Sequence, residues 1–158
     1  MKREDVLIDF ESSLGPWIGR TSKMVDYYIQ EGLENHGLDL TKEQMVVLKK
    51  VHDQDGLNQN ELAFLTYRDK SSLARLLAKM ERKELLYRRQ NSQDKRINEV
   101  FLTPKGQEIF QECIVVIKDI IETMEQNLTE TEILDTIRIL KQVQKNFTAQ
   151  KATLEEKI

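Results

Sequence analysis

The stretch NQNELAFLTYRDKSSLARLLAKMERKELLYRRQNSQDKRINEVFLT, residues 58–103, contains the signals that decide the fold. It begins with Asn58, and Asp69 follows within the same stretch. Both residue types favour the start of a helix, because their side chains accept a hydrogen bond from an amide of the first turn. We therefore predict a short helix from Asn58 to about Thr66 and a second helix that begins after Asp69.

The second of these helices is predicted to have one apolar face and one polar face. Its apolar residues are spaced i, i+3, i+4 and i+7, so they share one side of a helix, while polar and basic residues share the other. The apolar set is Leu73, Leu76, Leu77 and Met80, and the polar set is Ser71, Ser72, Arg75, Lys79 and Arg82. We expect the first set to be buried and the second to be exposed.

A β-hairpin is predicted after the second helix. The segments Leu85 to Arg89 and Ile97 to Thr103 contain residues that favour strands, and the QNSQDKR segment between them contains Asn, Ser and Asp, which favour turns. The hairpin therefore has a long polar tip. Four basic residues lie on the hairpin: Arg88, Arg89, Lys95 and Arg96.

Positive charge is concentrated in this part of the chain. Residues 67–96 contain ten Lys or Arg and four Asp or Glu, a net charge of +6, although the whole chain has a net charge of −3. The remaining 14 basic and 23 acidic residues give −9. Such asymmetry indicates a protein that binds a polyanion with one face while the rest of its surface keeps it in solution.

Amphipathic helices are also predicted before this stretch. Apolar residues at helical spacing run through residues 10–36, with an expected bend at Gly15-Pro16. Residues 41–44, TKEQ, have the pattern of a capping box, in which the Thr and Gln side chains each bind the other residue's backbone amide. This box predicts a helix that ends near Asp53.

Two further helices are predicted after the hairpin. Thr103-Pro104 begins the first, because proline is compatible with the first helical turn, and its apolar positions continue from Phe110 to Leu128. A second capping box, TETE at residues 129–132, begins a last amphipathic helix that continues through Phe147. The predicted fold class is thus mainly α, with a small β-hairpin.

Composition agrees with this class and excludes several others. The chain has 158 residues, 39% of them hydrophobic, with only six Gly and two Pro, and this is typical of a helical domain or of two small lobes that share a core. No apolar run reaches the ~20 residues of a membrane helix, and acidic residues stand where a secretion signal has its apolar segment. We expect a cytoplasmic protein with no membrane partner.

Catalytic, metal and cofactor sites are not expected. Cys113 is the single cysteine, and with His36 and His52 it forms no zinc-binding pattern. Cys113 also lies on an apolar stripe, where a buried thiol is unreactive, so a redox role is the less favoured interpretation. There is no nucleophile elbow and no phosphate-binding glycine loop, so we expect that the protein is not an enzyme.

The order of helix, short helix, helix and hairpin is that of a winged helix-turn-helix. In this arrangement a helix can enter the major groove of B-DNA, while the hairpin tip follows the backbone or enters the neighbouring minor groove. Phosphate is then the expected partner of the basic residues on the second helix and the hairpin. The alternative interpretation is a winged-helix module that binds an acidic protein partner.

The same stretches resemble the MarR (multiple antibiotic resistance) family of bacterial regulators. The resemblance covers Leu40 to Gly106 and is carried by LTKEQMVVLKKV, by NQNELAFLTYRDKSSLARLLAKMERKELLYRR, by DKR at Asp94 to Arg96, and by FLTPKG. It implies a homodimer with a helical dimerisation region, residues 1–37 and 104–158, and a winged helix-turn-helix DNA-binding domain, residues 38–103. It also implies a repressor that a small effector releases from a palindromic operator.

The expected site residues form three groups. The expected DNA-binding residues are Arg68, Lys70, Ser71, Ser72, Arg75, Lys79, Arg88, Arg89, Lys95 and Arg96. The resemblance implies Ser71, Ser72, Arg75 and Arg96, and the positive charge of the helix and the hairpin adds the others. Asp94 is expected to hold the wing arginine, Arg96, in place for the minor groove. Trp17, Arg20 and Met24 are candidates for a pocket that binds a small aromatic acid, although such a stripe is more often core or dimer interface.

One position departs from the family pattern. Many members have glycine just after the recognition helix, where a left-handed residue ends it, and this chain has Glu84 there. We expect this residue to adopt the left-handed conformation at a cost and to affect the turn into the hairpin.

Overall fold

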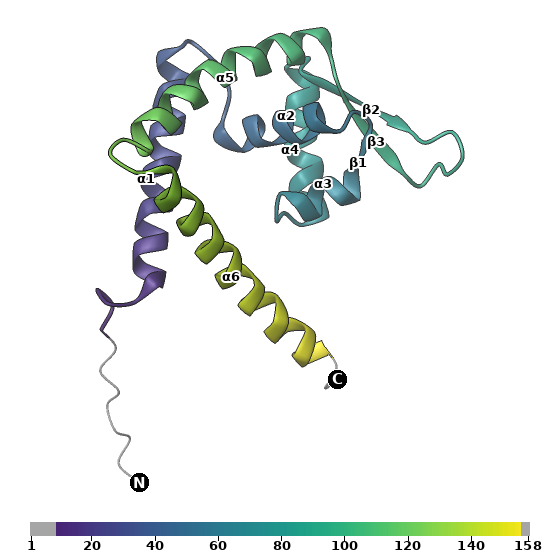
Figure 1. The fold of residues 1–158 in the computed structure, drawn as a ribbon. Coiled ribbons are helices and arrows are strands. Elements are labelled where there is room, and N and C mark those ends of the chain that lie inside the picture. The colour runs from purple at the N-terminus through teal and green to yellow at the C-terminus, as the bar shows by residue number, and fades with distance from the viewer. Residues whose placement is uncertain (1–8, 156–158) are drawn as a thin grey trace. The chain divides into compact units, whose positions relative to one another are not determined.

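The computed structural model describes residues 9–155, and this part of the chain forms six helices and a three-stranded sheet (Figure 1). The chain divides into two compact units, one up to Ile120 and one from Ile121 onward. The elements are α1 (Leu14–Asn35), α2 (Lys42–Asp53), β1 (Leu57–Asn58), α3 (Gln59–Leu65), α4 (Lys70–Arg82), β2 (Leu86–Gln90), β3 (Asn98–Leu102), α5 (Pro104–Met124) and α6 (Glu130–Glu155). The predicted mainly helical class is confirmed.

The helix starts predicted at Thr41 and Asp69 are confirmed. Thr41 Oγ1 accepts a hydrogen bond from Gln44 N at 3.2 Å, and Thr41 N donates to Gln44 Oε1 at the same distance, which completes the capping box of α2. The Asp69 carboxylate likewise accepts from Ser72 N at 2.7 Å and begins α4. These local bonds satisfy amides that a helix leaves without an intrahelical partner. They fix where α2 and α4 begin.

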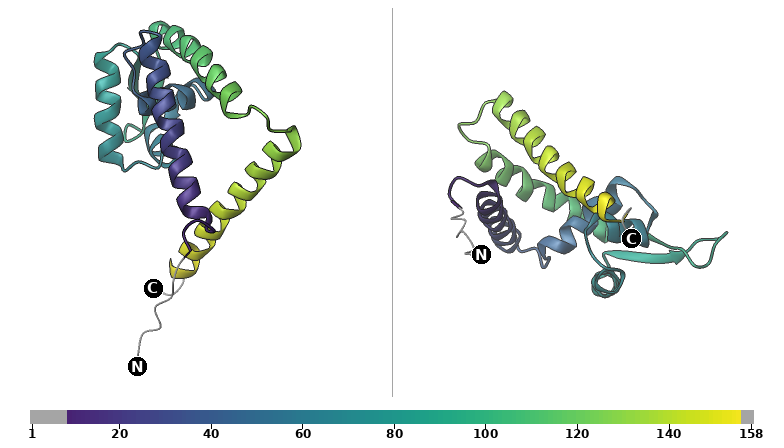
Figure 2. Two further views of the ribbon diagram at one scale, coloured as in Figure 1. Left: turned by 90° about the vertical axis from the view of Figure 1, so that its left-hand side faces the viewer. Right: turned by 90° about the horizontal axis from the view of Figure 1, so that it is seen from below.

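The sheet is antiparallel, with β3 in the centre, β1 on one side and β2 on the other. The hairpin of β2 and β3 was predicted, each strand within one or two residues, whereas β1 was not, because a two-residue strand has no periodicity. Both Leu57 of β1 and Arg88 of β2 are registered against Val100. The loop between β2 and β3 projects away from the helices of the first unit (Figure 2).

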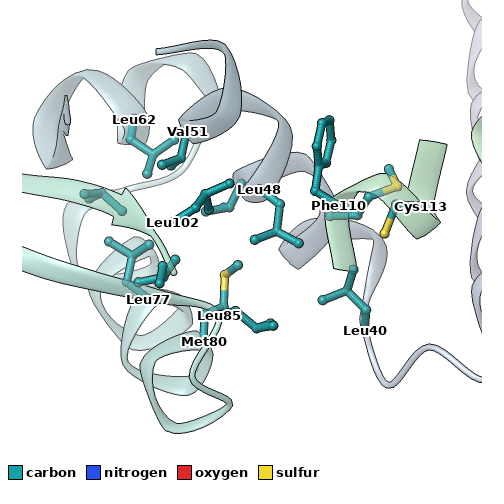
Figure 3. Close-up of a cluster of buried hydrophobic side chains, with 14 of the residues drawn as sticks. Leu40, Leu48, Val51, Leu62, Leu77, Met80, Leu85, Leu102, Phe110 and Cys113 are labelled. Carbon is teal, nitrogen blue, oxygen red and sulfur yellow. The ribbon is translucent and has the colours of Figure 1, made fainter. Parts of the chain in front are cut away.

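A hydrophobic core lies between α2, α3, α4, the sheet and the first half of α5 (Figure 3). The apolar face predicted for α4 contributes Leu73, Leu77 and Met80, all fully buried, while Leu76 packs at the edge of the cluster. Further members come from α2, α3, the turn after α4, the sheet and α5: Leu48, Val51, Leu62, Leu85, Leu86, Val100, Leu102, Phe110 and Cys113. The core therefore holds α4 by one side and leaves its polar side exposed.

Two differences from the sequence prediction concern α1. The helix begins at Leu14, so Gly15 and Pro16 lie in its first turn, where proline's missing amide has no bond to lose, rather than at a bend within the helix. Several apolar residues of its first half are exposed in the single chain, among them Leu14, Trp17 and Ile18. Burial is confined to the end of the helix, at Ile29 and Leu33.

Three helices end in the same hydrogen-bonded turn, with a left-handed residue just after the last helical turn. That residue is Gly37 after α1, Tyr67 after α3 and Glu84 after α4, with φ of 70°, 53° and 59°. In each turn its amide and the next amide bond back to the helix, as Glu84 N does to Glu81 O at 2.9 Å. Glu84 has the left-handed φ expected of it, in a turn of the same type as the turn at Gly37, and each non-glycine residue costs about 1 kcal/mol in this conformation.

The junction between the hairpin and α5 is tightly packed around Gly106. Thr103 N donates to Leu85 O at 3.1 Å, and Thr103 Oγ1 donates to Glu84 O at 2.5 Å, so the start of α5 is bonded to the turn that follows α4. A Cβ atom on Gly106 would lie 1.9 Å from Leu85 O. Only glycine, which has no Cβ, therefore fits at position 106.

No helix among residues 9–155 combines the length and the apolar composition needed to cross a membrane.

Candidate nucleic-acid interface

The polar face of α4 is presented as predicted. Lys70, Ser71, Arg75 and Lys79 are exposed, whereas Leu73 and Leu77 between them are buried in the core. Ser72 is partly buried, because its amide donates to the Asp69 cap and its hydroxyl accepts a hydrogen bond from Arg68 Nη1 at 2.8 Å. The first turn of α4 thus offers the exposed Ser71 hydroxyl and the Lys70 cation, and Arg75 follows on the same exposed side one turn later.

The hairpin tip holds Arg96 in a defined position. Asp94 Oδ1 accepts from both the amide and the Nε of Arg96 at 3.0 Å, and Asp94 Oδ2 accepts from Arg96 Nη2 at 3.0 Å. Asn91 Oδ1 in turn accepts from the amides of Gln93 and Asp94. Hydrogen bonding from Arg96 lowers the pKa of the Asp94 carboxyl, so the pair is charged at neutral pH.

Arg96 itself remains 90% exposed in its side chain despite this pairing. Asp94 therefore orients the guanidinium without burying it. A weakly hydrated, fixed guanidinium is suited to a narrow, strongly negative groove.

Arg88 differs from the expectation that phosphate is its partner. Its Nε donates to Glu81 Oε1 at 2.6 Å and its Nη2 donates to Glu81 Oε2 at 3.0 Å, and its side chain is only 27% exposed. This bidentate pair joins the last turn of α4 to β2. Arg88 therefore acts first as a brace between the two elements rather than as a free cation.

The Glu81–Arg88 pair makes a testable contribution to stability. The hydrogen bond from Arg88 lowers the pKa of the Glu81 carboxyl below its ordinary value near 4.5, so the stabilisation is present above that value and is lost as pH falls through the folded pKa. Glu81→Gln is expected to cost about 0.5–1 kcal/mol at pH 7, because a bidentate but partly exposed pair is of modest strength. Urea unfolding from pH 7 to pH 3 should show the two proteins converging at the acid end, and a constant difference would contradict this origin.

The hairpin has two other cations: Arg89, on β2, whose side chain lies over a ring of β3, and Lys95, at the tip. The Arg89 guanidinium carbon is 4.6 Å from the centre of the Phe101 ring, and the Tyr87 ring stacks on the same residue at 5.3 Å. Lys95 is exposed. Both groups are accessible to a ligand. The contact with the Phe101 ring favours one orientation of the Arg89 side chain.

The candidate effector residues lie on α1, and two of them, Trp17 and Arg20, are bonded to Glu11. Trp17 Nε1 donates to Glu11 O at 2.8 Å, and Arg20 forms an ion pair with the Glu11 carboxylate at 3.4 Å while lying 4.8 Å from the Trp17 ring centre. Met24 is exposed. In this single chain the three form an exposed cluster on the helix surface.

Sequence reasoning missed a pocket of about 300 Å³ beside the junction of α1, α4 and α5. Its lining combines apolar and charged side chains from segments that are distant in the sequence: Gly37, Leu38, Asp39, Lys83, Leu85, Lys105, Ile109 and Glu112. Lys83 is held there by Asp39 O at 2.8 Å and by Gln44 Oε1 at 3.1 Å. A pattern of neighbouring residues in the sequence could not have indicated it.

The expectations for Cys113 and for metals can be compared with the structure. Cys113 is fully buried, and burial, with a smaller effect of Glu112, raises the pKa of its thiol to about 11, so the reactive thiolate is scarce at neutral pH. Among residues 9–155 there is no group of three or more His, Cys, Asp or Glu that could hold a metal ion.

Comparison with known proteins gives consistent matches. The family model described as the MarR family matches residues 40–97. The transcriptional regulator HosA of Escherichia coli O157:H7 is 36% identical over 78 residues, which are 49% of this chain and 58% of HosA. The chain thus spans somewhat more than half of that relative. The HTH-type transcriptional regulator SarZ of Staphylococcus epidermidis is 30% identical over 128 residues, 79% of each chain.

A solved structure of a complex between S. aureus MepR and DNA has the same fold. It superimposes with a TM-score of 0.78 and 26% sequence identity, and the match covers 88% of this chain and 99% of MepR. The matched residues extend beyond the helix-turn-helix into the flanking helices.

Proposed function

Because the chain belongs to the MarR family, we propose that it is a cytoplasmic DNA-binding transcriptional regulator that acts as a homodimer on a palindromic operator. Residues 38–103 are the proposed DNA-binding domain, and residues 1–37 and 104–158 are the proposed dimerisation region. The relatives are named as transcriptional regulators, and regulators of this kind are not enzymes.

One observation carries the proposal. The cationic side chains of α4 and of the hairpin tip are exposed on the first unit, although the protein as a whole has a net negative charge. Arg75 and Lys79 stand on the outer face of α4, and Arg96 stands at the tip held by Asp94. A helix and an adjoining tip with this charge suit a major groove and the minor groove next to it. The remaining proposed contacts are Arg68, Lys70, Ser71, Ser72, Arg89 and Lys95, with Arg88 as a brace that sets the hairpin against α4.

The proposed dimer explains exposed apolar residues that a single chain leaves in water. On α1 these include Trp17 and Tyr28, and on α6 they include Ile137, Leu140 and Phe147. Large apolar side chains repeated along a helix face mark protein interfaces. A twofold dimer then places two copies of α4 at half-sites about one helical turn of DNA apart.

Repression by occupation of a promoter, and release by a small aromatic acid, complete the proposal. A coupling of about 1–3 kcal/mol between effector and operator is sufficient, because it changes operator affinity roughly 5- to 150-fold. Trp17, Arg20 and Met24 offer a ring, a cation and a flexible apolar side chain for such an acid. Titration of benzoate and hydroxybenzoates into the complex of protein and operator tests this part, and retention of the complex throughout would contradict it.

The DNA-binding proposal is tested through salt dependence. An operator first selected from random duplexes with the purified protein should bind with a slope of log K against log salt of about −5 to −9, as for six to ten neutralised phosphates. Arg96→Ala should weaken binding to every duplex and make the slope shallower by about 1, whereas Arg75→Ala should also reduce the preference for the operator. Unchanged affinity in both variants would contradict the assigned interface.

The same experiment separates the proposal from the alternative of an acidic protein partner. A protein-binding module should not enrich any duplex sequence and should show a shallow salt slope with all of them.

A further inference from the structure

Tyr67 occupies a position that favours glycine, and the fold gains little from its side chain. It is the left-handed residue of the turn after α3, where Tyr67 N donates to Phe64 O at 3.2 Å and Arg68 N donates to Ala63 O at 3.0 Å. The corresponding residue after α1 is Gly37. The Tyr67 side chain is 95% exposed, so packing does not compensate for the strain of its backbone.

Residues held in such conformations without support from packing often serve a ligand. Tyrosine is a demanding choice here, because a bulky side chain with positive φ is a genuine outlier. Glu84 has the same backbone geometry, but its side chain lies 3.9 Å from Lys105 Nζ, and the turn it forms is bonded to Thr103. The two positions therefore differ in what surrounds them.

The turn that contains Tyr67 leads directly into α4. Lys70 begins that helix three residues later, and Asp69 and Arg68 are both engaged with Ser72. In a helix-turn-helix the first residues of the second helix reach base edges, while the preceding helix crosses the sugar–phosphate backbone. The turn between them lies where the chain passes from the backbone into the major groove.

We propose that Tyr67 is a DNA-backbone contact: its hydroxyl donates a hydrogen bond to a phosphate oxygen at the edge of the major groove that α4 enters, and its ring packs on the adjoining sugar. The proposal rests on the DNA-binding function proposed above and adds an uncharged residue that is not among the DNA contacts proposed there. Tyrosine hydroxyls are among the groups that contact phosphate, and such contacts set the register of a protein without reading sequence.

A neutral contact has a signature that distinguishes it from the lysines and arginines. It releases no counterion of its own, so its loss lowers affinity without changing the dependence on salt. It also bonds a group that every duplex presents, so operator and random DNA should lose affinity by the same factor. A loss of folded protein would also lower both affinities by one factor, so thermal unfolding must be measured beside binding.

The test compares Tyr67→Phe and Tyr67→Gly with Glu84→Gly in the full chain. Tyr67→Phe keeps the ring and is expected to leave thermal unfolding unchanged while operator and random duplexes bind about 5- to 20-fold more weakly, with an unaltered salt slope. Tyr67→Gly removes the strain and should raise the unfolding midpoint while binding DNA at least as weakly as Tyr67→Phe. Glu84→Gly, the matched control, should raise the unfolding midpoint without loss of affinity.

The outcomes separate this inference from the general function. If the wild-type protein binds its operator with a steep salt slope and Tyr67→Phe binds equally well, the Tyr67 contact is wrong and the DNA-binding proposal stands. Gain of both stability and affinity in Tyr67→Gly would also overturn the contact. If the wild-type protein binds neither duplex, both proposals fail together.

Discussion

Gly106→Ala is expected to destabilise the first unit by at least about 3 kcal/mol, a large part of the stability of a small domain. The added Cβ would lie 1.9 Å from Leu85 O and 2.9 Å from the Leu85 carbonyl carbon, far inside contact distance. Both atoms belong to the backbone, so no side-chain rotation can relieve the clash. Either α5 or the start of β2 must move.

Movement is costly because both segments are anchored. Leu85 is buried and its carbonyl accepts from Thr103 N, while Gly106 N donates to Thr103 Oγ1 at 3.0 Å. Urea unfolding followed by circular dichroism measures the loss. Gly19→Ala is the control, since its Cβ would meet no atom within 4 Å and alanine is favoured by up to about 1 kcal/mol in an exposed helix. Equal stability of Gly106→Ala and the wild type would contradict the packing described at this junction.

Leu140→Glu is expected to abolish dimerisation and to weaken operator binding by roughly 100-fold or more, because two linked half-site contacts bind far more tightly than one. Leu140 lies in the middle of a stripe on α6 that also contains Ile137 and Phe147, and its side chain is 38% exposed in the single chain. A carboxylate within an apolar interface remains without a partner and is costly to bury. Sedimentation equilibrium and titration with operator DNA measure the two effects.

Gln142→Glu provides the control for charge. It lies two residues further along α6, about 200° around the helix from Leu140, and it is exposed, with its amide donating to Asn146 at 2.8 Å. This variant should remain dimeric and bind the operator as the wild type does. A Leu140→Glu protein that stays dimeric with unchanged affinity would show that the α6 stripe is not the dimer interface.

Features that depend on neighbouring residues were predictable from the sequence. The boxes at Thr41 and at Thr129 are both formed, the latter with Glu132 Oε2 accepting from Thr129 N at 2.8 Å. The buried face of α4 followed from the spacing of its leucines, and the orienting role of Asp94 involves a residue only two positions from Arg96. Local hydrogen bonds and helical periodicity act within a few residues, so sequence alone contains them.

Features that depend on segments meeting in space were not predictable. Arg88 and Glu81 are separated by a turn, and a basic residue on a strand gives no sign that a carboxylate on the preceding helix will hold it. The strand β1 exists because β3 offers it a partner. The role proposed for Tyr67 could not be predicted for a different reason. It depends on the exposure and the positive φ of this residue, which are known only from the structure of the turn.

The burial of Cys113 makes the protein convenient for spectroscopy. As the single cysteine in the chain, shielded by the core and with a thiol pKa near 11, it should react slowly with maleimide or methanethiosulfonate reagents. A cysteine introduced at the exposed Ser92 of the hairpin tip should therefore be labelled selectively without mutation of the native residue. Pairs of spin labels on the two subunits of a dimer would then report the separation of the hairpins directly, with and without DNA.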